Sequence, residues 1–343
     1  MIEPLIIAVV LRDLQIIASY NFKKRLELKM KAIVLEGPGD ISHLKFKDID
    51  IPEFGIGEVL INVKALSINP VDTQTRRGSG IYETLKNESP LIIGWDLAGV
   101  IVEIGKEVED FKVGDEVFGM VNFPGHGAAY GEYVVAPASH LALKPMHISF
   151  VEAAATTLAA LTAYQVIVKY ADVKRDQKVL IHGASGGVGH FAVQIARSLG
   201  AYVTGTSSAK NRDFVLSLGA HEHVDYNGSE LENKVHNVDF AFDCVGGNTV
   251  PRSIPLLKSG GVLIGITGIS ESEVIKAKQA NVHAYFILVK SSGADMKEIA
   301  KMLDQGILKP NVSKVLPFEK LAEAHQLLET GRTLGKIVLT ILD

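Results

Sequence analysis

The sequence predicts an α/β protein in two parts, a β-rich module followed by a doubly wound parallel sheet, and three observations lead to this expectation. First, residues 30–143 consist of short β-branched runs cut by glycine and proline, a spacing typical of a barrel-like set of strands. Second, residues 152–170 are rich in alanine, with apolar residues at helical spacing. Third, apolar strands and helical segments alternate after residue 177, which indicates a parallel sheet covered by helices.

Each expected element has a local signal, either a β-branched run or an apolar pattern of helical period. The strands are expected at residues 30–35, 59–66, 99–105, 116–121, 178–182, 202–206, 240–244, 262–266, 285–289 and 336–341. The helices of the second part are expected at residues 188–199, 211–218 and 318–329, with Gly219 ending the second of them.

The first 29 residues do not continue this pattern. Residues 4–11 are apolar, but positive charges follow this run instead of preceding it, unlike a signal peptide, and the run is too short to span a bilayer. Met30 begins an ordinary first strand. We therefore interpret residues 1–29 as an extension that arises from an upstream in-frame start or from cloning, with a genuine amphipathic extension as the alternative.

The composition excludes several classes of partner. The 343 residues include 35 basic and 39 acidic ones, a formal net charge of -4, so no strong field is available to hold nucleic acid or an anionic membrane. Cys244 is the single cysteine, which rules out an internal disulfide and a four-cysteine zinc site. We therefore expect a small-molecule partner. A protein with so few thiols is compatible with a reducing compartment, so we expect a cytoplasmic location.

The strongest local motif is a glycine-rich turn between a strand and a helix. Such a turn presents backbone N–H groups and the positive end of the helix dipole to a pyrophosphate. Gly186 allows close approach of the phosphates and Gly189 allows the helix to pack on the strand, whereas Ala184 replaces the usual first glycine. The alternative is a tight connection without a ligand. The predicted cofactor loop is Ala184, Ser185, Gly186, Gly187, Val188 and Gly189.

The next strand indicates which dinucleotide is bound. A site that prefers NAD places an acid at the end of this strand, on the ribose 2′-hydroxyl. Here the strand ends in Ser207 and Ser208, Lys210 follows, and no acid occurs before Asp213. Hydroxyl groups and a cation suit a 2′-phosphate, so the sequence predicts NADPH, although a solvated loop would have a similar composition.

Several motifs, in order, resemble the zinc-independent medium-chain dehydrogenase/reductases of the quinone oxidoreductase (zeta-crystallin-like) branch. The resemblance runs from Met30 to the C-terminus. It implies a GroES-like catalytic domain at residues 30–152 and 281–343, and a Rossmann NADP-binding domain at residues 153–280. The matching segments are residues 69–72, 77–78, 94–100, 113–119, 161–165, 183–189, 217–220, 225–226, 243–247 and 335–339.

The same resemblance implies roles for individual residues. Asn69, Asp72 and Tyr82 would line a substrate cleft between the domains, and Tyr82 is the candidate proton donor. The alternatives are that Asn69 and Asp72 cap a turn and that Tyr82 only packs. Thr162 would lie near the nicotinamide carboxamide, and Lys336 near the pyrophosphate. The remaining expected cofactor contacts are Lys210 and Tyr226 at the 2′-phosphate, and Val245, Thr267, Phe286 and Leu288 along the cofactor.

The resemblance also allows a test for zinc. The positions that match the catalytic zinc ligands of related dehydrogenases hold Asp72, Trp95 and Leu158, and two of these side chains cannot coordinate a metal. Residues 120–130 contain no cysteine, so a structural zinc lobe is not expected either. His126 and the pair His221 and His223 are weak candidates without an evident third ligand. We therefore predict no metal.

Without a Lewis acid, the expected substrate is an activated acceptor, a quinone or an α,β-unsaturated carbonyl that accepts a hydride at carbon. The prediction is an NADPH-dependent reductase of such compounds. The alternatives are an enoyl-thioester reductase and an NADPH-binding protein with a regulatory or structural role. By analogy with relatives, residues 262–269 would extend the sheet into a homodimer.

Overall fold

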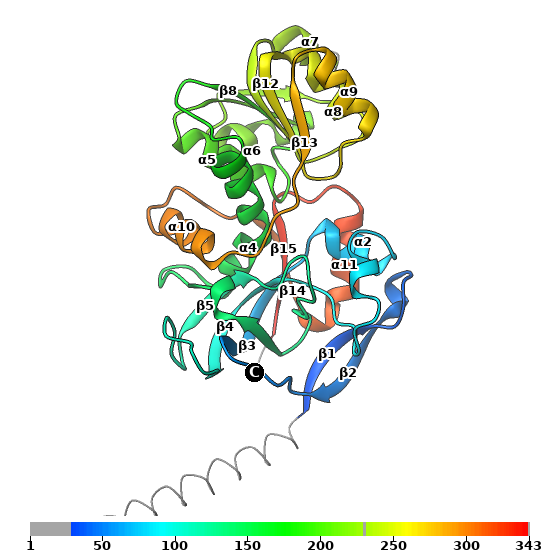
Figure 1. Cartoon of the computed structure of the whole chain (residues 1–343), viewed down its shortest axis with the longest axis vertical. Coiled ribbons are helices and arrows are strands. Elements are labelled where there is room, and N and C mark those ends of the chain that lie inside the picture. Colours follow the sequence, from blue (N-terminus) through cyan, green and yellow to red (C-terminus); the bar gives the residue numbers. More distant parts are fainter. Residues whose placement is uncertain (1–28, 229–230, 342–343) are drawn as a thin grey trace, which may run out of the picture.

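The computed structural model describes residues 29–228 and 231–341, and these form two lobes (Figure 1). The lower lobe in Figure 1 holds a seven-stranded sheet and a hairpin, and the upper lobe holds a six-stranded sheet. The helix α4 (Phe150–Tyr164) lies between the two lobes, and the C-terminal strand β15 (Lys336–Thr340) belongs to the seven-stranded sheet. The proposed extension lies outside the described residues, except that Lys29 already begins the first strand.

The lower lobe is built almost entirely from antiparallel pairs. Its sheet has the order β14-β15-β3-β4-β5-β7, with β6 paired to β3, and only β14 and β15 run parallel. The C-terminal strand β15 pairs with β3, so the end of the chain returns to the first lobe. The strands are β1 (Lys29–Leu35), β2 (Leu44–Asp50), β3 (Glu58–Ser67), β4 (Asp96–Ile104), β5 (Glu116–Met120), β6 (Tyr133–Pro137), β7 (Ala142–Leu143) and β14 (Val312–Pro317).

The upper lobe is an all-parallel sheet of order β10-β9-β8-β11-β12-β13, the doubly wound order in which a dinucleotide binds at the switch point. The predicted fold class is therefore confirmed. Its strands are β8 (Lys178–His182), β9 (Tyr202–Ser207), β10 (Glu222–Asp225), β11 (Val238–Asp243), β12 (Leu257–Gly265) and β13 (His283–Phe286). Its helices are α5 (Gly189–Ser198), α6 (Arg212–Ser217), α7 (Leu231–Lys234), α8 (Thr249–Ser253) and α9 (Glu271–Gln279).

Two sequence-based expectations about this sheet need correction. The strand β13 pairs in parallel with β12, so the upper lobe extends to Phe286 and does not end at residue 280. The segment 262–269 is not the edge that extends the sheet into a dimer, because its first residues lie in β12, which pairs with β11 on one side and β13 on the other. Since both sides of β12 are occupied, the edge strand at this end of the sheet is β13, and β10 is the edge strand at the other end.

The helix α4 connects the lobes. It begins with a capping box in which Ser149 Oγ accepts from the N–H of Glu152, and the Glu152 carboxylate accepts from the N–H of Ser149 at 2.8 Å. It packs on β3, β4 and β5 of one lobe and on α5 of the other. With the π-helix Gln165–Tyr170 it is long and apolar enough to cross a membrane, but 78% of this stretch is buried, as expected of a core helix.

Four further helices complete the lower lobe and its link to the upper one. They are α2 (Pro70–Arg76), α3 (Tyr82–Leu85), α10 (Gly293–Asp304) and α11 (Leu321–Glu329). Figure 1 shows α11 beside α2, and the two helices are in contact. The N-terminal end of α2 carries the first of the residues expected at a substrate.

Candidate functional site

The N-terminus of α2 is fixed by the Asn69–Asp72 motif. Asp72 Oδ2 accepts from the N–H of Asn69 at 2.6 Å, and Pro70 occupies the first turn, where a missing N–H costs nothing. The motif is therefore a helix cap, as the alternative interpretation held. The cap leaves the amide group of Asn69 available for a second task.

That amide belongs to a buried polar cluster around Asp96. Asp96 Oδ2 accepts from Ser67 Oγ at 2.6 Å and from Asn69 Nδ2 at 2.7 Å. Its other oxygen, Oδ1, accepts from the backbone N–H of Leu158 in α4 at 2.9 Å. Asp96 is fully buried, and these three donors solvate a carboxylate that is removed from water. We call Ser67, Asn69, Asp96 and Lys336 the Asp96 cluster.

Lys336 supplies the positive charge of the Asp96 cluster. Its Nζ donates to the carbonyl of Ile68 at 3.0 Å and to Asn69 Oδ1, and lies 3.6 Å from Asp96 Oδ2. Burial lowers the pKa of Lys336, and the Asp96 carboxylate acts in the opposite direction. The side-chain methylenes of Lys336 pack against Gly187 of the glycine loop. The contact is so close that a Cβ on Gly187 would lie 3.3 Å from Lys336 Cδ. This side chain therefore runs from the expected pyrophosphate position to the cluster.

Asp72 lies behind this cluster and is fully buried, so in this structure it does not open onto a surface as a cleft-lining residue would. Desolvation raises the pKa of Asp72 to about 7, the backbone N–H of Asn69 opposes this, and the Asp96 carboxylate adds to it. A hydrogen bond with the Tyr130 hydroxyl lowers the pKa of Asp72, and the same hydroxyl lies 3.0 Å from His325 Nε2. Burial lowers the pKa of His325 to about 3, so this imidazole is neutral.

Tyr82, the expected proton donor, begins the short helix α3, which contacts α2. Its side chain is partly buried and packs against the hydrophobic core. A partly buried position fits a tyrosine that only packs and also fits one that contacts the substrate. The role of Tyr82 as proton donor therefore stays a prediction.

The glycine loop between β8 and α5 has the close approaches that the motif predicts. A Cβ on Gly189 would lie 2.1 Å from the carbonyl oxygen of Gly183, a distance that no side chain tolerates. His190 Nδ1 donates to the carbonyl of Gly186 at 2.9 Å, and burial lowers the pKa of His190 to about 4. The N–H of Gly335 donates to the carbonyl of Ser185 at 2.9 Å, which ties the loop to the C-terminal strand.

The residues expected at a 2′-phosphate gather beyond the end of β9. Ser207 is buried, whereas Lys210 is exposed and Tyr226 is 49% exposed. The N–H of Tyr226 donates to the carbonyl of Ser207 at 3.2 Å, and Asn211 Nδ2 donates to Ser185 Oγ at 3.0 Å. Ser208 follows directly at the start of the turn. The structure thus brings this predicted set next to the glycine loop.

The remaining expected cofactor residues lie on the loops after β11 and β12, in α4, and at and after the end of β13. Asp243 Oδ1 accepts from the N–H groups of Val245 and Gly246 at 2.7 and 2.8 Å, which holds Val245 beside the glycine loop. Thr267 approaches Gly246. The Thr162 hydroxyl donates to Leu158 in its own helix at 2.7 Å. Phe286 and Leu288 are 45% and 39% exposed.

The positions that match zinc ligands are engaged in other contacts in this structure. The Trp95 indole is fully buried and donates to the carbonyl of Gly125 at 2.8 Å, Leu158 offers only its backbone, and Asp72 holds the helix cap. Within residues 29–228 and 231–341, no three His, Cys, Asp or Glu side chains are grouped closely enough to hold a metal ion.

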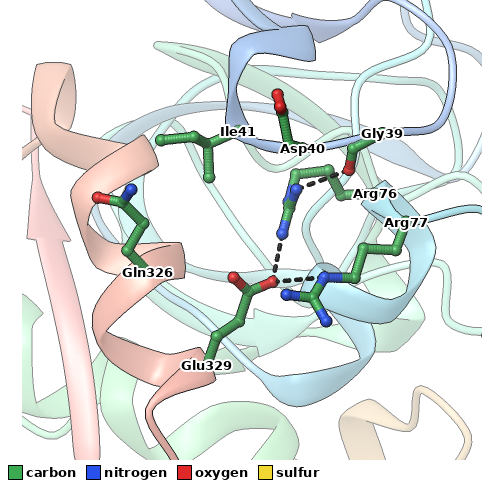
Figure 2. Close-up of a pocket in the computed structure, with 7 residues that line it drawn as sticks. All are labelled: Gly39, Asp40, Ile41, Arg76, Arg77, Gln326 and Glu329. Carbon is green, nitrogen blue, oxygen red and sulfur yellow. Dashed lines mark hydrogen bonds and ion pairs between the residues drawn. The ribbon is translucent and has the colours of Figure 1, made fainter.

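A cavity of about 320 Å³ lies at the other end of α2 (Figure 2). Figure 2 shows Arg76 and Arg77 of α2 converging on Glu329 of α11. Arg76 Nη1 also donates to the carbonyl of Gly39 at 2.7 Å. Since both arginines pair with Glu329 and Asp40 accepts from the N–H of Ser42, we assign this cavity to the packing of α2 on α11.

Sequence reasoning missed three contributors to the site, Asp96, Asp243 and Tyr130. Asp96 and Asp243 each belong to a motif that carried the resemblance, and each begins or ends an apolar strand segment, so a buried acid at a strand end was the available signal. Tyr130 gave no local signal, because its partner His325 is 195 residues away.

A two-domain architecture with a glycine loop at the switch point of a parallel sheet is that of a nucleotide-dependent oxidoreductase. Two family models match the chain, "Alcohol dehydrogenase GroES-like domain" over residues 55–146 and "Zinc-binding dehydrogenase" over residues 218–339. The chain therefore belongs to the medium-chain dehydrogenase/reductase family, in its quinone oxidoreductase branch, as the relatives below show.

The chain is 31% identical to the mitochondrial NAD(P)H oxidoreductase RTN4IP1 of Danio rerio, over 95% of each chain. It is also 31% identical to the chloroplastic NADPH-dependent alkenal/one oxidoreductase of Arabidopsis thaliana, over 91% of this chain and 79% of the relative. Among solved structures, the quinone oxidoreductase from Coxiella burnetii is 35% identical with a TM-score of 0.87, over 92% of this chain and 100% of that one.

Proposed function

We propose that this protein reduces quinones or α,β-unsaturated carbonyl compounds with NADPH and without a metal. The observation that carries this proposal is the Asp96 cluster, in which a lysine ammonium and an asparagine amide lie next to the positions that match metal ligands in related dehydrogenases. The relatives named as quinone and alkenal/one oxidoreductases support the substrate class.

The residues present fit the cofactor. The glycine loop is closed to side chains at Gly189, and the N-terminus of α5 follows it, which suits a pyrophosphate. Ser207, Ser208, Lys210 and Tyr226 would hold the 2′-phosphate, because hydroxyl groups and a cation replace the acid of an NAD site. When bound, the cofactor supplies a hydride.

The chain's own residues would bind the acceptor and stabilise the charge that develops on its oxygen. The Asn69 amide hydrogen that Asp96 does not accept would be the preorganised donor to this oxygen, and the Lys336 ammonium, which donates to Asn69 Oδ1 and to the Ile68 carbonyl, would hold the amide in place. The side chains of Trp95 and Leu158 offer no metal ligand, which restricts this chemistry to acceptors that need no Lewis acid.

The proposal is tested by following NADPH oxidation by absorbance with a panel of quinones and enones, with and without a chelator. We expect turnover that the chelator leaves unchanged, and no oxidation of simple alcohols by NADP⁺, which serves as the control for zinc-type chemistry. Loss of turnover with the chelator would contradict the metal-free mechanism. Binding of NADPH without any turnover would favour a regulatory or structural role instead.

A lysine substitution tests the cofactor preference. Replacing Lys210 by alanine is expected to weaken NADPH binding about tenfold, the worth of one charge-assisted contact to phosphate, and to leave NADH binding unchanged. Fluorescence titration of both cofactors measures this. The matched control is Lys178→Ala. Lys178 is an exposed lysine at the start of β8, and the glycine loop follows the other end of that strand. Equal losses for NADPH and NADH would show that Lys210 does not contact the 2′-phosphate.

We further propose a homodimer and a cytoplasmic location. The strand β13 is one of the two edge strands of the parallel sheet, and Val274, Ile275 and Phe286 on and near this edge are between 40% and 51% exposed. An exposed edge with apolar neighbours favours pairing with a second copy. The location rests on the single cysteine and on the reducing cofactor.

A further inference from the structure

A histidine outside the predicted cofactor-binding set lies directly behind the predicted 2′-phosphate site. His223 is in β10, and its Nε2 is 2.8 Å from Ser207 Oγ at the end of β9. His223 pairs in register with Gly205, two residues before Ser207, so the two side chains lie on the same face of the sheet. The contact is therefore built into the strand register.

The direction of this hydrogen bond follows from the second bond that Ser207 makes. When Ser207 Oγ donates its hydrogen to the carbonyl of Ser208 at 3.2 Å, it accepts from His223. In this arrangement Nε2 of His223 carries the hydrogen, which is the tautomer that the inference below uses. The long distance to Ser208 is a weak bond, and the hydroxyl hydrogen can turn to a stronger acceptor such as a phosphate oxygen while His223 holds the Ser207 oxygen in place.

The charged groups that act on His223 come from its own strand and from α6. Burial and Arg212 lower the pKa of His223, and Asp225 raises it, burial being the largest influence. Arg212 is the first residue of α6, and Asp225 pairs in register with Ser207. His223 is only partly buried, so a proton from solvent can reach the imidazole.

We propose that His223 is a positioning residue for the 2′-phosphate of NADPH, which holds the Ser207 hydroxyl for donation to the phosphate and takes up one proton as the phosphate binds. The proton adds at Nδ1 and converts the neutral ring into an imidazolium, which offsets part of the phosphate charge. This inference rests on the proposed preference for NADPH. It adds a histidine to the predicted set of Ser207, Ser208, Lys210 and Tyr226.

Proton uptake is measured by calorimetric titration of 2′,5′-ADP and of 5′-AMP in buffers of different ionisation enthalpy near pH 7, where a histidine beside a bound phosphate changes charge. We expect uptake on the order of half a proton with 2′,5′-ADP and none with 5′-AMP. The affinity for NADPH, but not for NADH, is expected to rise as the pH falls from 8 toward 7, because protonation accompanies binding.

Two variants separate the hydrogen bond from the charge. His223→Gln keeps an N–H donor for Ser207 and is expected to keep NADPH affinity at pH 8 while losing the proton uptake. His223→Val removes both and is expected to weaken NADPH binding about tenfold at pH 7, with NADH unaffected. The matched control is His221→Gln, since His221 bonds Arg197 and Val203 and stacks on Tyr202.

The outcomes distinguish this inference from the function on which it rests. If the unaltered protein binds 2′,5′-ADP no more tightly than 5′-AMP, the NADPH preference fails and the role of His223 fails with it. If the preference exists but His223→Val keeps it, or loses NADPH and NADH affinity equally, only the role of His223 is overturned. If proton uptake persists in His223→Gln, His223 is not the group that takes up the proton.

Discussion

Replacing Lys336 by methionine is expected to lower the free energy of unfolding by about 3–5 kcal/mol and to abolish most reductase activity. The variant would leave the fully buried Asp96 carboxylate without its positive neighbour, and Asn69 Oδ1 and the Ile68 carbonyl without their donor. Breaking a buried pair by removing one partner costs this much because the remaining charge is uncompensated. Urea unfolding at pH 7 and the NADPH oxidation assay measure the two effects.

The control is the double variant Lys336→Met with Asp96→Asn. It removes both charges, and the amide oxygen introduced at position 96 could still accept hydrogen bonds from Ser67 and Asn69. We therefore expect the double variant to recover a large part of the lost stability but not the activity. If Lys336→Met alone costs less than about 1 kcal/mol, the range of exposed pairs, Lys336 would not be the charge that balances Asp96.

Replacing Asp72 by asparagine is expected to stabilise the protein at pH 8 and to have a much smaller effect near pH 4. The pKa of Asp72 is about 7 in the folded protein against an ordinary value of 3.8, so the folded state binds the proton more tightly. The stability gained from this proton is fully present below about pH 4 and is lost as the pH rises to about 7. The loss amounts to about 4 kcal/mol at most.

Asparagine cannot ionise, but it retains an oxygen for the N–H of Asn69, so the helix cap is kept. Urea unfolding from pH 4 to 8 should therefore show the advantage of Asp72→Asn growing up to about pH 7 and then remaining constant. The matched control is Asp40→Asn, because hydrogen bonds from Ser42 lower the pKa of that exposed carboxyl. An advantage that is the same at every pH would show that Asp72 does not hold a proton in the folded state.

The sequence was sufficient to predict the strands and the helix around the glycine loop, and the close packing of that loop. The positions of β8, β9 and α5 follow from local apolar patterns, and the close approach at Gly189 follows from the glycine spacing, because both depend on residues within a few positions of one another. The same holds for the Asn69–Asp72 cap. The 2′-phosphate set of Ser207, Ser208 and Lys210 is equally local, and its role stays a prediction.

The limits of the upper sheet were less accessible to the sequence. The resemblance placed the domain boundary at residue 280, before β13, and the analogy with relatives placed the dimer edge at residues 262–269, because short apolar strands look alike whether they lie inside a sheet or at its edge. Strand order is decided by which neighbours bury each face, and this information is not present in any single strand.

Only the tertiary structure decided what surrounds the buried charges. Lys336 and Asn69 are 267 residues apart, and they meet because β15 returns to pair with β3. The family resemblance identified Lys336 as a basic residue near the cofactor, but a buried ammonium goes where acceptors can solvate it, and these come from distant strands. The sequence by itself determined the nucleotide-binding frame, and the folded chain determined the polar cluster, because hydrogen-bond partners of buried charges are chosen by packing and not by spacing.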